Sequence, residues 1–132
     1  MAQMILVVDD SAMVRRYVRQ ELEKMGFNVA EAADGTAALE ALPSVRPVLV
    51  ISDVNMAPMD GFGLLAGIRA KYTREALPVL MLTTEADDSM KARGKNAGAN
   101  GWLVKPFDPV RLREVVQHVV AKASGAGGGA PR

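Results

Sequence analysis

MILVVDDS (residues 4–11) joins a short apolar run to two adjacent carboxylates, Asp9 and Asp10. A near-continuous apolar run is typical of a strand that is covered on both faces of its sheet. Two neighbouring negative charges at the mouth of an apolar core repel each other, and each of them also loses hydration. The stretch therefore predicts a buried strand, and its acidic pair needs an explanation beyond packing.

Four further short runs follow the first and alternate with segments of helical spacing. Three of them are near-continuously apolar, whereas NVAEA is more polar and is expected at a sheet edge. Strict alternation of strands and helices implies right-handed crossovers and helices on both faces of the sheet. We predict an α/β fold, a five-stranded parallel, doubly wound, flavodoxin-like sheet of strand order 2-1-3-4-5. The four runs are NVAEA (28–32), VLVIS (48–52), PVLMLT (78–83) and GWLV (101–104).

Capping residues and the spacing of apolar residues predict five helices. The fourth is the weakest, because its segment is polar and contains Gly94. The expected helices run from the cap Ser11 to a stop at Gly26, from the cap Asp34 to an end at Pro43, over 61–72 after the cap Asp60, over 87–98 with an interruption at Gly94, and from the cap Asp108 with Pro109 in the first turn.

The bulk composition limits the classes of function. The 132 residues fit one domain, expected over 1–123, with a flexible Gly-rich tail at 124–132. A net charge of +1 gives no basic footprint for nucleic acid, and the lack of cysteine excludes disulfides and Cys-based metal sites. No segment reaches the ~20 apolar residues of a membrane span, and no signal peptide precedes the first strand. We therefore expect a cytoplasmic protein without membrane insertion.

Reactive side chains follow several of the predicted strands. In open α/β sheets, ligands bind beyond the carboxyl ends of the strands, where the strand order reverses. Asp9 and Asp10 follow the first strand and Asp53 follows the third, so three carboxylates converge if these strands are neighbours. Oxygen ligands without Cys or clustered His point to Mg²⁺. With Thr83 and Lys105 on the far side, the set predicts a phosphoryl-transfer site.

The motifs at these strand ends resemble those of response-regulator receiver domains, most closely the stand-alone chemotaxis members of that family. The resemblance runs from residue 4 to about residue 122. It rests on VVDDS, on SDVNM and MDG after the third strand, on LTTE after the fourth, and on GANGWLVKPFDP around the fifth.

The resemblance implies a role for each matching position. Asp53 would be the phosphoacceptor. Asp10 would be the main Mg²⁺ ligand, Asp9 would help through a bound water, and Asp53 and the backbone carbonyl of Asn55 would complete the coordination. Lys105, aimed by a cis bond to Pro106, would pair with Asp53 and then with the phosphoryl group. Thr83 and Trp102 would form the conformational switch. Asn55, Thr84 and Glu85 would tune the lifetime of the phosphoryl group.

Three residues depart from the usual pattern of the family. Pro58 lies one residue later than usual in the loop after Asp53. Thr84 is bulkier than the small residue that often follows the switch threonine, which would reduce access to the phosphoryl group. Trp102 replaces a Tyr or Phe and has no hydroxyl. His118 is expected to be a solvated helix residue rather than a phosphate carrier.

The resemblance also implies partners. We expect a single-domain regulator, monomeric, that receives its phosphoryl group from a histidine kinase and signals by binding a target such as the flagellar motor switch, with a phosphatase as a possible further partner. The alternative within the family is a phosphate sink or relay intermediate outside chemotaxis, or a receiver that docks without being phosphorylated.

Two alternatives lie outside the family. An aspartyl-nucleophile phosphatase would generally carry D-x-D at the nucleophile, whereas Asn55 stands two residues after Asp53. A flavin carrier would need a phosphate-binding first loop, and DDSAM (9–13) is acidic and glycine-free. Both are therefore disfavoured.

Overall fold

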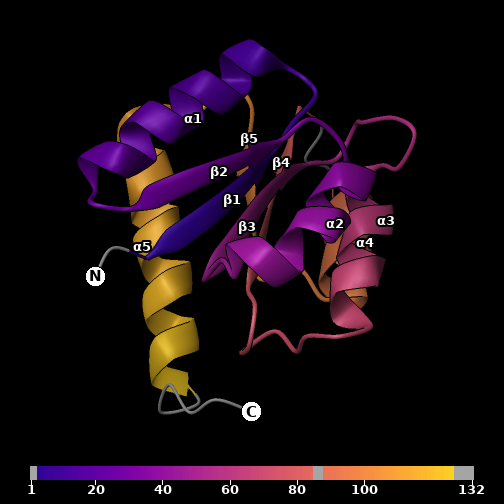
Figure 1. Cartoon of the computed structure of the whole chain (residues 1–132). Coiled ribbons are helices and arrows are strands. Elements are labelled where there is room, and N and C mark those ends of the chain that lie inside the picture. The colour runs from indigo at the N-terminus through magenta and orange to yellow at the C-terminus, as the bar shows by residue number, and fades with distance from the viewer. Residues whose placement is uncertain (1–2, 85–87, 127–132) are drawn as a thin grey trace.

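A computed structural model describes residues 3–84 and 88–126, with side chains to residue 123 (Figure 1). Its parallel sheet has the order β2-β1-β3-β4-β5, which confirms the predicted doubly wound topology. The strands are β1 (Met4–Val8), β2 (Asn28–Ala32), β3 (Leu49–Asp53), β4 (Val79–Thr83) and β5 (Gly101–Val104). The helices are α1 (Ala12–Lys24), α2 (Gly35–Val45), α3 (Gly61–Arg69), α4 (Asp88–Ala97) and α5 (Pro109–Ala126).

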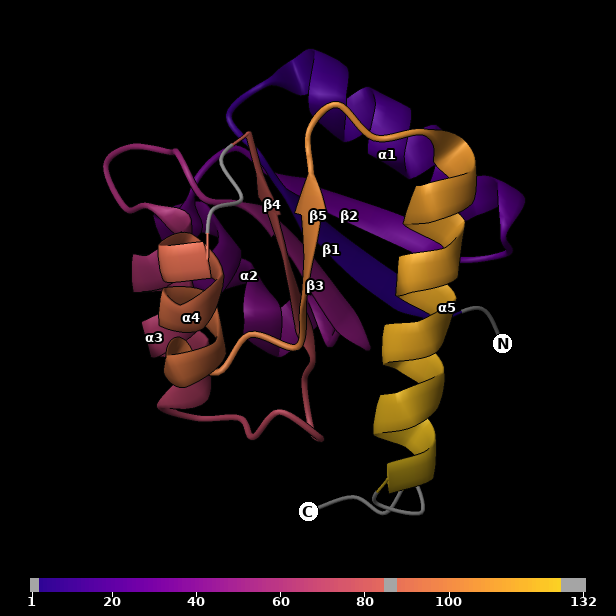
Figure 2. The same cartoon turned by 180° about the vertical axis from the view of Figure 1, so that it is seen from behind.

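The sheet lies between two helical layers. Helices α2, α3 and α4 cover one face, and α1 and α5 cover the other (Figures 1 and 2). β1 and β3 are central and pair with each other, with Val8 opposite Ser52. NVAEA forms β2, one of the two edge strands, as its polarity predicted. The reversal of strand order therefore falls between β1 and β3, where Asp9 and Asp53 lie.

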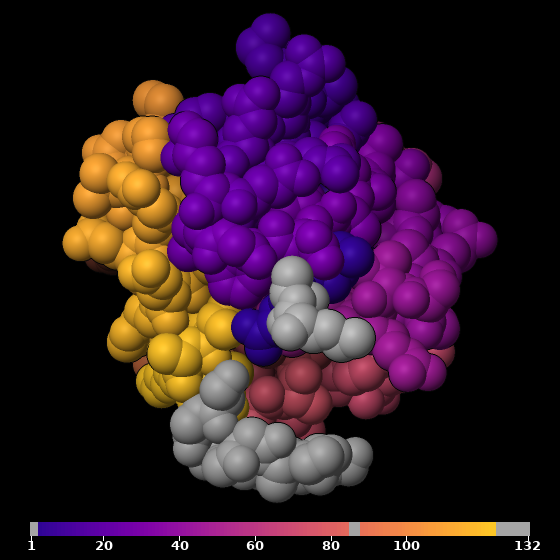
Figure 3. All heavy atoms as spheres, turned by 60° about the vertical axis from the view of Figure 1, so that its left-hand side comes forward, coloured from indigo at the N-terminus to yellow at the C-terminus, as the bar shows by residue number. Residues whose placement is uncertain are grey.

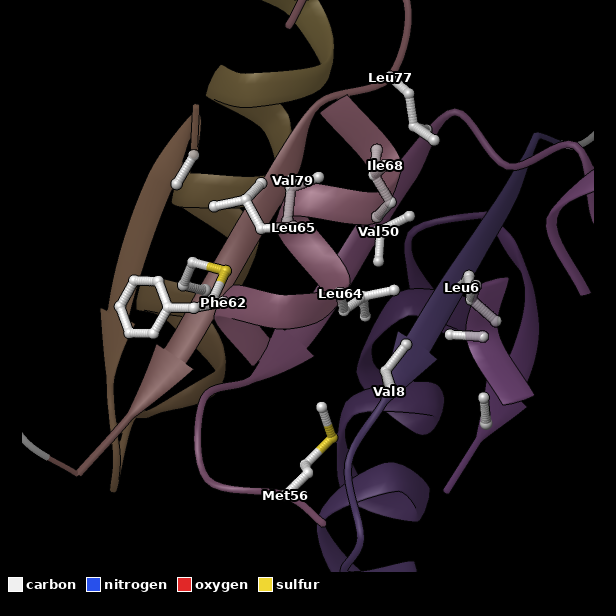
Figure 4. Close-up of a cluster of buried hydrophobic side chains, with 14 of the residues drawn as sticks. Leu6, Val8, Val50, Met56, Phe62, Leu64, Leu65, Ile68, Leu77 and Val79 are labelled. Atoms are coloured by element: carbon white, nitrogen blue, oxygen red, sulfur yellow. The ribbon is translucent and has the colours of Figure 1, made fainter. Parts of the chain in front are cut away.

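Each face of the sheet has its own apolar core. On the side of α2, α3 and α4, side chains such as Leu6, Val50 and Leu64 are fully buried (Figure 4). On the other side, Ile5, Ile51, Leu80 and Leu82 pack against the buried stripes of α1 and α5. This alternation explains why the strand segments read as continuous apolar runs.

The predicted caps begin the helices. Ser11, Asp34 and Asp60 each accept a hydrogen bond from the backbone N–H three residues later, and the Asp108 carboxylate accepts one from the N–H of Arg111. These bonds satisfy backbone donors that a helix leaves unpaired in its first turn. The helix starts could therefore be predicted from single residues.

Three helix predictions need correction. Pro43 does not end α2, which continues to Val45, because a proline in the last turn removes only one backbone donor and Arg46 in the left-handed region caps the end. Gly94 does not interrupt α4, and the residue is small because a Cβ there would overlap Trp102. α3 ends at Arg69, three residues before the predicted end at 72.

The surface beside the edge strand is formed by α1 and β2, with α5 on one side and the elements that follow β2 on the other (Figure 3). α5 continues to Ala126, beyond the residue where the tail was expected to begin, and residues 127–132 lie outside the described part of the chain. Within the described ranges, no helix is long and apolar enough to cross a membrane.

Candidate functional site

Three carboxylates meet at the carboxyl edge of the sheet. Asp9 and Asp10 directly follow β1, and Asp53 is the last residue of the neighbouring β3. Each of the three offers one oxygen, and these oxygens all lie within 4.8 Å of one another. The predicted convergence of Asp9, Asp10 and Asp53 is therefore present in the structure.

Asp9 is the buried member of the cluster, with 0% exposure. Its Oδ1 accepts a hydrogen bond from the Ser11 N–H at 2.9 Å, and its Oδ2 lies 2.9 Å from Nζ of Lys105. Its backbone N–H donates to the carbonyl of Ala32 at the end of β2. Asp10, by contrast, is exposed. Asp9 is thus fixed from several sides, while Asp10 faces solvent.

Lys105 brings the positive charge into the cluster. It follows β5, and its backbone N–H donates to the carbonyl of Thr83 at 2.8 Å. Its ammonium group lies 2.9 Å from Asp9 Oδ2 and 3.2 Å from Asp53 Oδ1. The Lys105–Pro106 peptide is cis, as expected from the resemblance. One cation is therefore shared between two buried carboxylates.

The pKa values of Asp53 and Lys105 reflect this sharing. Burial raises the pKa of Asp53, and the negative charge of Asp9 raises it further, against the opposing effects of Lys105 and of a hydrogen bond from the Asn55 backbone N–H. Burial alone would lower the pKa of Lys105, but its hydrogen bond to Asp9 and the charges of Asp9 and Asp53 outweigh burial, so that pKa rises. A second cation would therefore relieve repulsion between the carboxylates.

The loop after Asp53 returns tightly to the strand. The N–H of Gly61 donates to the carbonyl of Val54 at 2.8 Å, and a Cβ at Gly61 would collide with the backbone carbonyl of Asp53. Glycine is therefore required where α3 begins. Within this loop the Ala57–Pro58 peptide is cis.

Thr83 and Thr84 lie on the opposite side of the site. Thr83 ends β4 and is fully buried, whereas Thr84 is exposed. Asp53 pairs with Leu82 in the register of β3 and β4, so Thr83 follows directly beside the acidic cluster. Glu85, expected to tune the phosphoryl lifetime, lies outside the described residues.

Trp102 sits half-buried on β5 and packs into the face covered by α4. The centroid of its ring lies 6.3 Å from that of the Phe62 ring. The guanidinium of Arg93 stacks over the Phe62 ring, 3.9 Å from its centroid. A Cβ on Gly94 would overlap the Trp102 indole. Gly94 therefore leaves α4 unbroken and makes room for the large aromatic side chain.

The donor set fits a hard divalent cation. All three clustered side chains offer carboxylate oxygen, which Mg²⁺ prefers and which needs no Cys or His. Among the described residues, this is the one group of three or more potential metal-ligating side chains. The cluster therefore suits Mg²⁺ held by few carboxylates, with coordination positions left for water and phosphate.

Comparison with known proteins agrees with this architecture. Residues 5–117 match the model of the response regulator receiver domain. The chain belongs to the response-regulator receiver family. This receiver is 40% identical to the chemotaxis protein CheY of Pseudomonas aeruginosa over 92% of its own length and 98% of that protein, and 41% identical to CheY-3 of Vibrio cholerae over 87% and 89%.

Solved structures give the same result. The V. cholerae chemotaxis protein CheY4 superposes with a TM-score of 0.85 at 42% identity, covering 90% of this receiver and 99% of that chain. A two-component system response regulator/GGDEF domain protein superposes with a TM-score of 0.87 at 30% identity, covering 92% of this chain and 50% of the other. The chain is therefore a CheY-like signalling receiver.

One feature of this receiver site was missed from the sequence. Arg15, in the first turns of α1, donates to the backbone carbonyl of Asp9. No motif marks it, because a helix-borne arginine is usually a solvated charge. Helical spacing from the Ser11 cap could have placed Arg15 on the side of α1 that faces Glu31 on β2. It could not have predicted the contact with the carbonyl of Asp9.

Proposed function

We propose that this receiver accepts a phosphoryl group on Asp53 from the phosphohistidine of a kinase and signals by binding a target protein in chemotaxis. The observation that carries the proposal is the buried Asp53 carboxylate, which lies beside Asp9 and is paired with Lys105 at 3.2 Å. The similarity to chemotaxis proteins over nearly their full length supports the pathway.

In the proposed reaction, an Asp53 oxygen attacks the phosphorus atom of the donor phosphohistidine. A P–O bond to Asp53 forms and the P–N bond breaks, and its electron pair stays on the imidazole nitrogen. Lys105 then pairs with a phosphoryl oxygen in place of the carboxylate. Asp9, Asp10, Asp53 and the Asn55 carbonyl would hold Mg²⁺, which supplies charge neutralisation for the phosphoryl oxygens.

The switch would follow from the new charge at Asp53. A phosphoryl group adds about −1.5 to −2 charges and three strong acceptors at one spot. We propose that the Thr83 hydroxyl moves to donate to one of them, and that Trp102 repacks in response. Trp102 touches both α3 through Phe62 and α4 at Gly94, so its movement would reach the surface formed by α4, β5 and α5.

Residues at the rim would set how long the phosphoryl group persists. Asn55 and Thr84 are both exposed beside the buried cluster, which supports a role in admitting water or the donor. The role of Glu85 is proposed from the resemblance alone.

Thr84→Ala should speed phosphorylation by a small-molecule donor by a few fold, since it removes bulk at the entrance. Stopped-flow Trp102 fluorescence with acetyl phosphate would measure this, with the exposed Thr73→Ala as the control variant.

The experiment that tests the proposal is titration with a beryllofluoride mimic of the phosphoryl group in the presence of Mg²⁺. Trp102 is the only tryptophan, so its fluorescence reports the switch directly. We expect a saturable change in wild type and none in Asp53→Asn. An unresponsive wild type would remove the proposed chemistry.

The pathway needs a separate test. Phosphotransfer from each purified histidine kinase of the source organism should be fastest from a chemotaxis kinase. Preference for another kinase would favour the alternative function, a phosphate sink or relay intermediate, which the same site could perform.

A further inference from the structure

Arg15 links three parts of the molecule beside the acidic cluster. Its side chain, 18% exposed, rises from α1 between the edge strand β2 and the loop after β1. Nε donates to Oε1 of Glu31 on β2 at 2.9 Å. Nη1 donates to the backbone carbonyl of Asp9 at 2.6 Å. One guanidinium thus ties the edge strand to the acidic loop.

The bonded carbonyl has a special place in the chain. Because the peptide unit is planar, the carbonyl oxygen of Asp9 and the N–H of Asp10 share one rigid plane. Holding that oxygen therefore fixes the plane from which Asp10 departs. The hydrogen bonds from Ser11 and Lys105 act on the Asp9 carboxylate, and the bond from the Asp9 N–H to the Ala32 carbonyl acts on the preceding peptide.

Asp10 needs such support more than the other two carboxylates. It is exposed, and its oxygen lies within 4.8 Å of the oxygens of Asp9 and Asp53, so repulsion favours conformations that swing it outward. A backbone bond resists this movement without occupying a carboxylate oxygen.

We propose that Arg15, oriented by Glu31, is a positioning residue for the metal site: it holds the Asp9–Asp10 peptide so that both carboxylates can bind Mg²⁺ together. This inference rests on the proposed function, because it assumes that the cluster binds Mg²⁺.

Charge alone does not account for this role. Arg15 and Glu31 form an ion pair, so together they add little net charge to the cluster. Glu31 is itself held by Nη1 of Arg19 at 2.8 Å, and hydrogen bonding from Arg19 lowers the pKa of the Glu31 carboxyl against the effect of burial. The pair therefore acts mainly through geometry.

Arg19 provides a matched control. Both arginines lie on α1 and pair with Glu31, but Arg19 donates its other hydrogen bond to Glu23, whereas Arg15 donates to the Asp9 carbonyl. Arg15→Met and Arg19→Met each remove one positive charge and one bond to Glu31. Only the first removes the bond to the acidic loop.

Calorimetric titration of the whole chain with MgCl₂ tests the inference. We expect Arg15→Met to bind Mg²⁺ about tenfold more weakly than wild type, the scale of effects seen when a partner behind a metal ligand is lost. Arg19→Met should stay within about twofold. Equal losses in both variants, or an unchanged Arg15→Met, would overturn the inference alone. A wild type that binds no Mg²⁺ would overturn the proposed function and the inference together.

A second readout needs no metal. The Asp10 amide nitrogen belongs to the peptide whose carbonyl Arg15 holds, so its ¹⁵N shift should change in Arg15→Met and stay in place in Arg19→Met. Arg15→Lys keeps the charge but cannot serve Glu31 and the carbonyl with one planar fork. It should restore Mg²⁺ binding only in part, and serves if Arg15→Met does not fold. Full restoration by Lys would show that charge suffices and would contradict a positioning role.

Discussion

The surroundings of Asp53 disfavour ionisation of its carboxyl group. It is 5% exposed and lies beside the fully buried Asp9, and one ammonium group serves both. Its pKa is raised because burial and the Asp9 charge together outweigh Lys105. The repulsion between the Asp9 and Asp53 carboxylates in the unphosphorylated protein favours the binding of a cation to the cluster.

Replacing Asp53 should therefore stabilise the metal-free protein. Because folding raises the pKa of Asp53, the folded chain binds that proton more tightly than the unfolded chain, in which an Asp has a pKa of about 3.9. The native state thus loses stability as the pH rises through the raised pKa. We expect Asp53→Asn to raise the free energy of unfolding at pH 7 by on the order of 1 kcal/mol.

Urea denaturation in EDTA across pH measures the difference. The advantage of Asp53→Asn should shrink towards zero as the pH falls below the pKa of the unfolded carboxyl, where both chains are neutral at this position. An advantage that persists at the lowest pH would show that shape, not charge, is responsible.

At the scale of helices and strands, the fit between α4 and β5 depends on one missing methyl group. Alanine normally favours a helix interior over glycine by about 1 kcal/mol, but a Cβ on Gly94 would overlap the Trp102 ring, and overpacking costs about 1–3 kcal/mol. We expect Gly94→Ala to displace Trp102, to redshift its fluorescence and to lower stability. Gly67→Ala is the control, since its added methyl meets only the flexible end of Leu39. Unchanged fluorescence in Gly94→Ala would contradict the packing described here.

Arg69, the last residue of α3, joins the segments that precede β4 and β5. It donates to the carbonyls of Leu77 and Gly98 and to Oδ1 of Asn100, each at 2.8 Å. Burial lowers the pKa of Arg69 to about 10, which leaves it charged at neutral pH.

Arg69→Met should destabilise the fold by about 2–4 kcal/mol, because it leaves several partly buried acceptors without a charged donor. Chemical denaturation would show it against the exposed neighbour Lys71→Met, expected within ~0.5 kcal/mol of wild type. Equal stability of the two variants would contradict the role of Arg69 in joining these loops.

Local signals explain which elements could be predicted. Caps such as Ser11 and Asp60 act within three residues, so helix starts follow from the sequence alone. The continuation of α2 through Pro43 and of α4 through Gly94 depends on what each helix meets in space, and for Gly94 that partner is eight residues away on β5. No periodicity contains that information.

For the site, too, some features could be predicted from the sequence and others could not. Asp9, Asp10, Asp53 and Lys105 could be brought together from strand order alone, because parallel strands deliver their carboxyl ends to one edge. The contact of Arg15 with the Asp9 carbonyl depends on side-chain direction across a helix and an edge strand, which the spacing of residues does not specify.

At the scale of the whole molecule, metal binding and folding should be coupled. A ligand that binds only the native state stabilises it by about 2.7 kcal/mol at a hundred times its Kd. We expect Mg²⁺ to raise the thermal midpoint of wild type, since it relieves repulsion among three carboxylates held together by the fold. Asp10→Asn should lose most of this shift. Calorimetry with and without MgCl₂ measures it, and an equal shift in both proteins would place the metal elsewhere.

The most direct test of the account is the mass of the intact protein after incubation with acetyl phosphate and Mg²⁺, followed by localisation of the modified residue. We predict the addition of one phosphoryl group, on Asp53, in wild type, and none in Asp53→Asn or in the presence of EDTA. Phosphorylation that persists in Asp53→Asn, or a wild type that remains unmodified, would contradict the central claim.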